Sequence, residues 1–178
     1  MLKMSDFNLK TGTKVVYPAH GVGEVNGIET QVIGGSEITA YVVVFEKDKM
    51  KLRIPVVRAE SSGLRPLCSV NELDKVRSTL KGRARTSRGM WSRRAKEYES
   101  KINSGNIISL AEVVRDLHKN VDDPDRSYSE RVIYENALHR LAGEISAVEN
   151  IDILQATSFL LKTINDNTPR KKSEEEAA

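Results

Sequence analysis

The sequence has a single cysteine, Cys68, and no apolar run that approaches the roughly 18 residues of a membrane span. One cysteine excludes an internal disulfide and favours a reducing compartment, so we expect a cytoplasmic protein in which Cys68 is an inert core residue. The opening segment MLKMSDFNLK lacks the continuous apolar stretch of a secretory signal. We therefore expect no contact with a membrane.

Residues that catalyse reactions or bind metals are also scarce and scattered. The three histidines, His20, His118 and His139, fall in separate predicted elements, and none has a cysteine or carboxylate at metal-ligand spacing. No G-x-x-x-x-G-K-[ST] phosphate loop is present. The segment GVGEVNG leads from strand to strand, so it offers no helix N-terminus to a dinucleotide phosphate. We expect a protein that is not an enzyme and needs no metal or cofactor.

Positive charge is concentrated in one short part of the chain. Residues 69–105 carry 10 Lys and Arg against 4 Asp and Glu, whereas residues 1–68 carry 9 against 7 and residues 106–178 carry 9 against 14. A local basic patch is typical of a protein that binds a polyanion such as nucleic acid. A solvated helix face has the same composition, and charge alone does not separate the two.

The first third of the chain has the composition of short β-strands. Four segments rich in Val, Ile, Thr and Tyr are separated by tight-turn signals, including HGVG at 20–23 and Gly34-Gly35. The segments are TKVVYP, GVGEVNGIETQVI, EITAYVVVFE and KLRIP. This pattern predicts a small SH3- or Tudor-like β-barrel over residues 1–66, with SSGLRP (61–66) marking the domain boundary.

Residues 67–166 are expected to form an all-α domain of about five helices, which makes the chain an α+β protein of two domains. The expected helices span about 70–80, 90–103, 107–119, 128–148 and 152–165. Three Ser-x-x-Glu capping boxes are predicted to begin at Ser69, Ser109 and Ser127. The tail at 167–178 has no apolar periodicity and is expected to be disordered.

The only tryptophan lies in the densest run of positive charge, KGRARTSRGMWSRRAKEYESK at 81–101. Trp91, Ala95, Tyr98 and Ile102 share one helical stripe, so one interpretation is that Trp91 begins the buried face of its helix. Cations lie in the flexible loop before it and in the helix after it. They are Arg83, Arg85 and Arg88, then Arg93, Arg94 and Lys96. A flat ring at such a helix start can stack on a base or wedge between base steps. The residues alone leave core filler and DNA wedge both open.

Several stretches of the chain resemble the CarD/CdnL family of bacterial transcription regulators. KVVYPAHGVGEVNGIET and LRIPVVRAESSGLRPL are similar to its N-terminal Tudor-like domain, which is shared with the transcription-repair coupling factor. WSRRAKEYESKINSGNIISLAEVVRDL is similar to the start of the helical DNA-binding domain of CdnL-type members. The resemblance covers about residues 8–165 in the expected order.

The resemblance implies that the helical domain stabilises the promoter open complex. Trp91 matches a wedge that enters the minor groove at the upstream edge of the transcription bubble. Arg93 and Lys96 match positions that contact the DNA backbone, and Arg94 is expected to assist them. The long basic loop, with Arg85 and Arg88, adds further capacity to bind phosphate.

The resemblance also implies that the Tudor-like domain binds the β subunit of RNA polymerase. The matching positions are Val42, Val43, Arg53 and Pro55. Val42 and Val43 are neighbours in one strand, so one of them faces the core, and the sequence does not say which. The chain departs from some members at Gln31, where they carry an arginine, so we assign Gln31 no contact.

The sequence also gives expectations for location and oligomeric state, for an alternative function and for the C-terminal residues. The protein is expected to be a nucleoid-associated monomer in the cytoplasm. An alternative function is that of an architectural protein that binds duplex DNA without polymerase. The last residues, Ala177 and Ala178 after SEEE, resemble bacterial protease recognition tails, although an ordinary ragged terminus would look the same.

Overall fold

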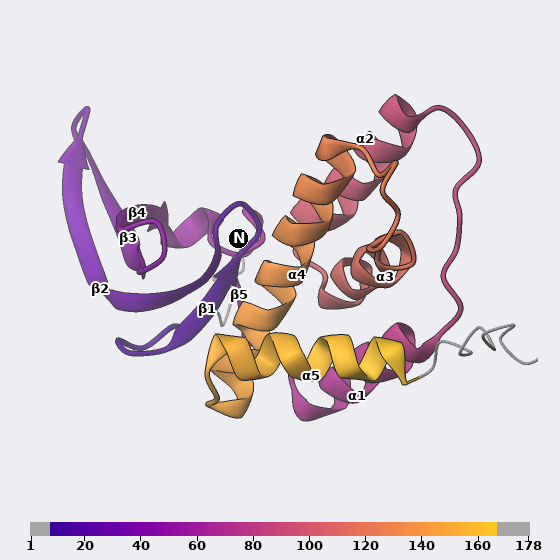
Figure 1. Ribbon diagram of the computed structural model, residues 1–178. Coiled ribbons are helices and arrows are strands. Elements are labelled where there is room, and N and C mark those ends of the chain that lie inside the picture. The colour runs from indigo at the N-terminus through magenta and orange to yellow at the C-terminus, as the bar shows by residue number, and fades with distance from the viewer. Residues whose placement is uncertain (1–7, 167–178) are drawn as a thin grey trace, which may run out of the picture.

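The computed structural model describes residues 8–166, so the expectations for the tail, including Ala177-Ala178, lie outside the described residues. A curved β-sheet lies beside a bundle of helices (Figure 1). The described elements run in the order of five strands and then five α-helices, with one 3₁₀ turn inside the β part. The expected α+β class, with an N-terminal Tudor-like part followed by a helical part, is confirmed.

The sheet is antiparallel with the strand order β4-β3-β2-β1-β5. Its strands are β1 (Lys14–Tyr17), β2 (Gly21–Ile33), β3 (Ser36–Phe45), β4 (Met50–Pro55) and β5 (Arg65–Pro66). Gly34 and Gly35 join β2 to β3 with φ of 59° and 80°, a two-residue turn that suits the twist of paired strands. The segment 61–66, expected only to break the β pattern, ends in β5, which pairs with β1.

Alternation along the strands places the β core on one face of the sheet. Tyr41, Val43 and Phe45 of β3 are each at most 2% exposed, and they pack with Val15 of β1 and Val25 of β2. Residues of even number on β3 face the other way because successive side chains of a strand alternate between its two faces. The opposite face carries the even-numbered residues of β3, of which Ala40 and Val42 are also buried, at 8% and 4% exposed.

The helices begin and end within a few residues of the predicted positions. They are α1 (Val70–Lys81), α2 (Trp91–Asn103), α3 (Ile107–His118), α4 (Tyr128–Glu149) and α5 (Ile153–Asn165). One apolar core joins all five helices, with Leu80, Val114, Leu117, Leu141 and Leu160 almost completely buried. Figure 1 shows the basic segment between α1 and α2 as an extended stretch along the side of the helices away from the sheet.

The three predicted capping boxes have three different outcomes. Ser69 and Glu72 form a complete box at α1. The box at Ser109 was wrong, because Asn106 caps α3 by accepting hydrogen bonds from the N–H groups of Ile108 and Ser109. At α4, Ser127 accepts from the N–H of Glu130, but the carboxylate of Glu130 accepts from the amide of Asn120 at 2.9 Å instead of closing the box.

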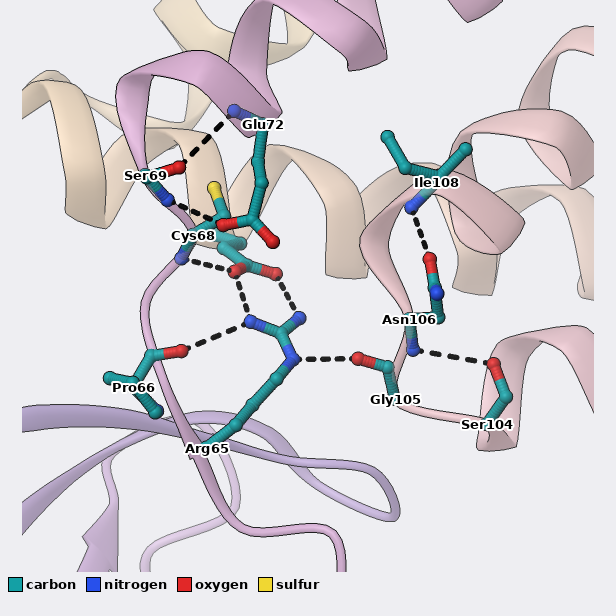
Figure 2. A network of polar contacts seen from close by, with 10 residues as sticks. Arg65, Pro66, Cys68, Ser69, Glu72, Ser104, Gly105, Asn106 and Ile108 are labelled. Carbon is teal, nitrogen blue, oxygen red and sulfur yellow. Dashed lines mark hydrogen bonds and ion pairs between the residues drawn. The ribbon is translucent and has the colours of Figure 1, made fainter. Parts of the chain in front are cut away.

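A buried ion pair joins the sheet to α4. The guanidinium of Arg65, on β5, donates to both carboxylate oxygens of Glu144 at 2.6 and 2.8 Å, and Glu144 is only 2% exposed. The same guanidinium donates to the carbonyl of Gly105 at 2.6 Å, as Figure 2 shows. Glu144 also accepts from the N–H of Cys68 at 3.0 Å. Through these hydrogen bonds the pair links the sheet, the β5–α1 connection, the α2–α3 turn and α4.

A close contact around Pro18 supports this ion pair. A Cβ atom on Gly63 would lie 2.7 Å from the Pro18 ring, and one on Gly105 would lie 3.0 Å from it. Both glycines also have positive φ, at 86° and 74°. Arg140 of α4 donates to the carbonyls of Pro18 and Ala19. Only glycine at these two positions lets the β1–β2 turn approach both the loop before β5 and the α2–α3 connection this closely.

We predict that Glu144→Gln destabilises the protein far more than a matched change at the surface. The amide would leave the Arg65 guanidinium without a charged partner in a buried site, so the free energy of unfolding should fall by roughly 3 kcal/mol. Urea unfolding followed by circular dichroism measures this. Glu149→Gln on the same helix is the control: its partner is Arg77, both side chains are more than a third exposed, and the expected loss is below about 1 kcal/mol. Equal losses would contradict the role given to the buried pair.

Candidate nucleic-acid interface

Trp91 is half-buried at the start of α2. Its ring packs against Tyr98 with 6.3 Å between ring centroids, and its indole N–H donates to the hydroxyl of Ser129 at 2.7 Å. The guanidinium of Arg94 lies 5.5 Å from the ring centroid. Contacts with α2 and α4 thus hold the indole in one orientation, while part of its surface stays exposed to solvent.

The buried part of the α2 stripe lies behind Trp91. Tyr98 and Ile102 are each 5% exposed and belong to the helical core, and Ala95 is half-buried against it. The expected phase of the stripe is confirmed for these residues. A fully buried Trp91 would have marked it as a core residue alone, and the structure does not bury it fully.

The N-terminus of α2 carries no compensating negative charge. Its N-cap residue is Met90, which supplies no side-chain hydrogen bond, and the first turn contains no acidic residue. The first N–H groups of a helix have no partner within the helix and carry partial positive charge. The helix start therefore favours an anion beside Trp91.

Most of the predicted cations around Trp91 are exposed. Arg85, Arg88, Arg93 and Lys96 face solvent, whereas Arg94 is half-buried along the indole. Arg93 forms only an exposed ion pair with Glu97, at 3.5 Å. Such pairs are weak, so a phosphate can compete for the guanidinium. Of the predicted DNA contacts, Arg94 therefore lies against the ring, and the other four cations are accessible to solvent.

The basic segment between α1 and α2 is anchored, although the sequence suggested a flexible loop. The backbone N–H of Arg85 donates to Asp116 at 2.9 Å, and the hydroxyl of Ser87 donates to Glu97 at 3.1 Å. The ammonium of Lys119 donates to the hydroxyl of Thr86. These contacts hold the backbone of the segment while the side chains of Arg85 and Arg88 remain exposed.

Asp116 supports the interface, and the sequence analysis did not identify it. It is 5% exposed, lies beside Arg115 on α3, and accepts from the Arg115 guanidinium at 2.8 Å as well as from Arg85. The sequence carries a signal for this pair, because the two charges interrupt the apolar stretch EVVRDL. Charges that are buried in such a stretch need partners.

The candidate contacts on the β part are divided between the two faces of the sheet. Val42 of β3 pairs with Arg53 of β4, and Ala40 pairs with Pro55, so Val42, Arg53 and Pro55 share the face opposite the core. Val43 points into the core and is fully buried. Val42 lies on the opposite face from Val43, but it is only 4% exposed, so neither valine offers an accessible side chain.

Arg53 is held in place on the face opposite the core. Its Nε atom donates to Glu29 of β2 at 2.8 Å, and both side chains are about half exposed. Its strand, β4, is the edge of the described sheet, so one side of its backbone has no neighbouring strand there. An edge strand can pair with an extended segment of another protein.

Two of the three histidines pack against tyrosines. The ring of His20 stacks on Tyr17 with 5.8 Å between centroids, and His118 is buried and shares a hydrogen bond of 2.8 Å with the hydroxyl of Tyr134. Burial lowers the pKa of His139 below its ordinary value. Within residues 8–166, no group of three or more His, Cys, Asp or Glu could hold a metal ion. In the same part of the chain, no helix is long and apolar enough to span a bilayer.

The fold and this site together define a protein with a Tudor-like β part docked on a helical part. The helical part presents a partly exposed tryptophan that is flanked by cationic side chains. Comparison with known families gives two matches. Residues 9–68 match the CarD-like/TRCF RID domain, and residues 75–161 match the CarD C-terminal domain. The chain is also 29% identical over 148 residues to the Bacillus subtilis (strain 168) protein named "Putative transcription factor YdeB", covering 83% of this chain and 97% of that protein.

The chain belongs to the CarD/CdnL family, because the two domain matches follow one another in order and together span most of it. This is a family of transcription factors and not of enzymes, and the protein is accordingly a transcription regulator.

Proposed function

We propose that the protein binds the β subunit of RNA polymerase through its β part and stabilises the promoter open complex through its helical part. Trp91 enters the minor groove at the upstream edge of the bubble, and neighbouring cations hold the DNA backbone. One observation carries this proposal: the only tryptophan stands half-exposed at an uncapped helix start among cations.

The surroundings of Trp91 suit a ring that inserts into DNA. A wedge must be held rigidly, because a freely rotating ring would lose conformational entropy on binding. Tyr98 supports one part of the indole, Ser129 accepts its N–H and Arg94 lies along the ring. The ring is therefore set in place before DNA arrives.

The cations near Trp91 supply backbone contacts without reading sequence. Arg93 and Lys96 on α2, with Arg88 and Arg85 on the anchored basic segment, are exposed and face no buried partner through their side chains in the described part of the chain. Contacts between such side chains and phosphates position a protein on DNA and make its affinity depend on salt. Specificity for promoters then comes from polymerase and from the opened DNA.

The β part tethers the protein to polymerase. The match to the CarD-like/TRCF RID domain supports this role, and the face that carries Arg53, Pro55 and the buried Val42 is the surface that we assign to it. Tethering raises the effective concentration of the helical part at the promoter. Weak, sequence-independent DNA contacts can then act at the right place.

The expected effect on promoter opening is moderate. Stacking of one aromatic side chain on a base contributes about 1–3 kcal/mol. A ligand shifts a two-state equilibrium only by its differential affinity for the two states. If Trp91 binds only opened DNA, the open state gains roughly 5- to 150-fold over the closed state. The protein is therefore a modulator of initiation and not an on–off switch.

We predict that Trp91→Ala shortens the lifetime of the open complex by at least about fivefold. The reason is the loss of the ring, so Trp91→Phe should retain part of the effect. The lifetime is measured by challenging preformed complexes with a competitor. Leu154→Ala, an equally apolar change at an exposed position of α5, is the control and should leave the lifetime unchanged. Circular dichroism establishes folding: an unfolded Trp91→Ala would show a core role, and a folded variant with a normal lifetime would refute the wedge.

We predict that Arg53→Glu abolishes binding to polymerase and leaves the fold intact. The substitution reverses a half-exposed charge on this face, beside Glu29. Pull-down of polymerase by the tagged variant measures the effect. Lys162→Glu makes the same change of charge at an exposed position of α5 and should bind normally. Undiminished capture by Arg53→Glu would contradict the assignment of this face.

The alternative function, an architectural protein that binds DNA without polymerase, is favoured only by the cations around Trp91. Titration of linear duplex DNA at several salt concentrations separates the two functions. A polymerase-dependent regulator should bind free duplex only in the non-specific range, about 10⁻⁴–10⁻⁶ M at physiological salt, with a strong salt dependence. Nanomolar binding to free duplex would support the architectural protein instead.

A further inference from the structure

A second aromatic residue lies exposed next to the candidate wedge. Tyr128 is the first residue of α4, and 79% of its surface is accessible. Large aromatic side chains are normally buried, so one that is this exposed has either no role or a partner. Tyr128 begins a helix without belonging to that helix's buried stripe, so the sequence pattern carries no signal for it.

The fold brings Tyr128 to Trp91. The indole N–H of Trp91 donates to Ser129 at 2.7 Å, and Ser129 is the residue after Tyr128. Consecutive Cα atoms are about 3.8 Å apart. The Cα atom of Tyr128 therefore lies within about 9 Å of the indole nitrogen of Trp91, which is less than three base steps of roughly 3.4 Å each. Met90, which precedes Trp91, is also 78% exposed.

We propose that Tyr128 is a second DNA-stacking residue, which acts beside Trp91 on an unpaired base at the edge of the opened DNA. The inference rests on the proposed function and names a further residue for the same site. Aromatic side chains stack on any base, because every base has a π face, so this contact needs no specific sequence.

The charges around Tyr128 favour nucleic acid as its partner. Arg131 lies one helical turn after it and is exposed, and Arg93 and Arg88 are exposed near Trp91. The acidic residue of the first turn of α4, Glu130, is buried and bonded to Asn120, so it does not oppose a phosphate there. An apolar protein partner would gain little from Arg88, Arg93 and Arg131, whereas nucleic acid gains from both the rings and these cations.

Negative charges on the other side of Tyr128 favour a base, and not the phosphate backbone, as its partner. Asp122, Asp123 and Asp125 are exposed in the connection that leads into α4. Phosphates are repelled on that side and attracted on the side of α2 and Arg131. A stacked base is uncharged and tolerates this position. The contribution of Tyr128 should therefore come from its ring and not from its hydroxyl.

The test uses the fluorescence of Trp91, which reports this site alone because the chain has one tryptophan. The full-length protein is titrated with a duplex that contains a short mismatched, pre-opened segment, and with the same duplex fully paired. For Tyr128→Ala we expect the Kd for pre-opened DNA to rise about five- to tenfold, with the Kd for paired duplex unchanged. Tyr128→Phe should stay within about twofold of the wild type, and Leu154→Ala should not differ from it.

The outcomes separate this inference from the function on which it rests. If pre-opened DNA quenches Trp91 and Tyr128→Ala binds it as tightly as the wild type, Tyr128 has no stacking role and the wedge stands. If Tyr128→Phe is as defective as Tyr128→Ala, the hydroxyl and not the ring makes the contact, which overturns the proposal. If DNA leaves Trp91 unquenched and Trp91→Ala keeps a normal open-complex lifetime, the proposed function itself fails.

Discussion

The buried ion pair between Arg65 and Glu144 is the interaction on which the rest of the structure depends. A carboxylate that is 2% exposed must be paired, and its partner comes from the sheet, so the helices and the sheet satisfy each other. The Arg65 guanidinium also donates to the carbonyl of Gly105, and the Glu144 carboxylate also accepts from the N–H of Cys68. The β part and the helical part are therefore set in one relative orientation.

Helix α4 carries this orientation to the candidate nucleic-acid interface. Glu144 and Arg140, in the C-terminal half of α4, contact the β part. Ser129, in the first turn of α4, accepts the hydrogen bond from the indole of Trp91. Glu144 lies 15 residues after Ser129, which is about 22 Å along the helix. One rigid element thus links the aromatic ring to the domain that we assign to polymerase. A fixed separation is what a protein needs to place a ring at a defined distance from a tethering point.

Much of this architecture could be predicted from the sequence, and the failures have definite physical causes. Periodicity located all five helices, because each must bury one apolar stripe. The cap at Ser109 was wrong because Asn106, three residues earlier, is an equally good cap, and only the chain path after Gly105 decides between them. Strand β5 was missed because two residues carry no periodicity. Its evidence is its pairing with β1.

What the sequence determined by itself is the local pattern: a stripe that begins at Trp91, a concentration of cations around it, turns at paired glycines, and a resemblance to one family over about residues 8–165. What only the tertiary structure decided is which groups meet. It turned Val43 into the β core and Val42 to the opposite face of the sheet, anchored the basic segment on Asp116, and brought α4 to the indole of Trp91. These contacts join residues 31 to 79 positions apart, or depend on strand register. No local rule encodes them, because their energy comes from packing and from the desolvation of paired charges.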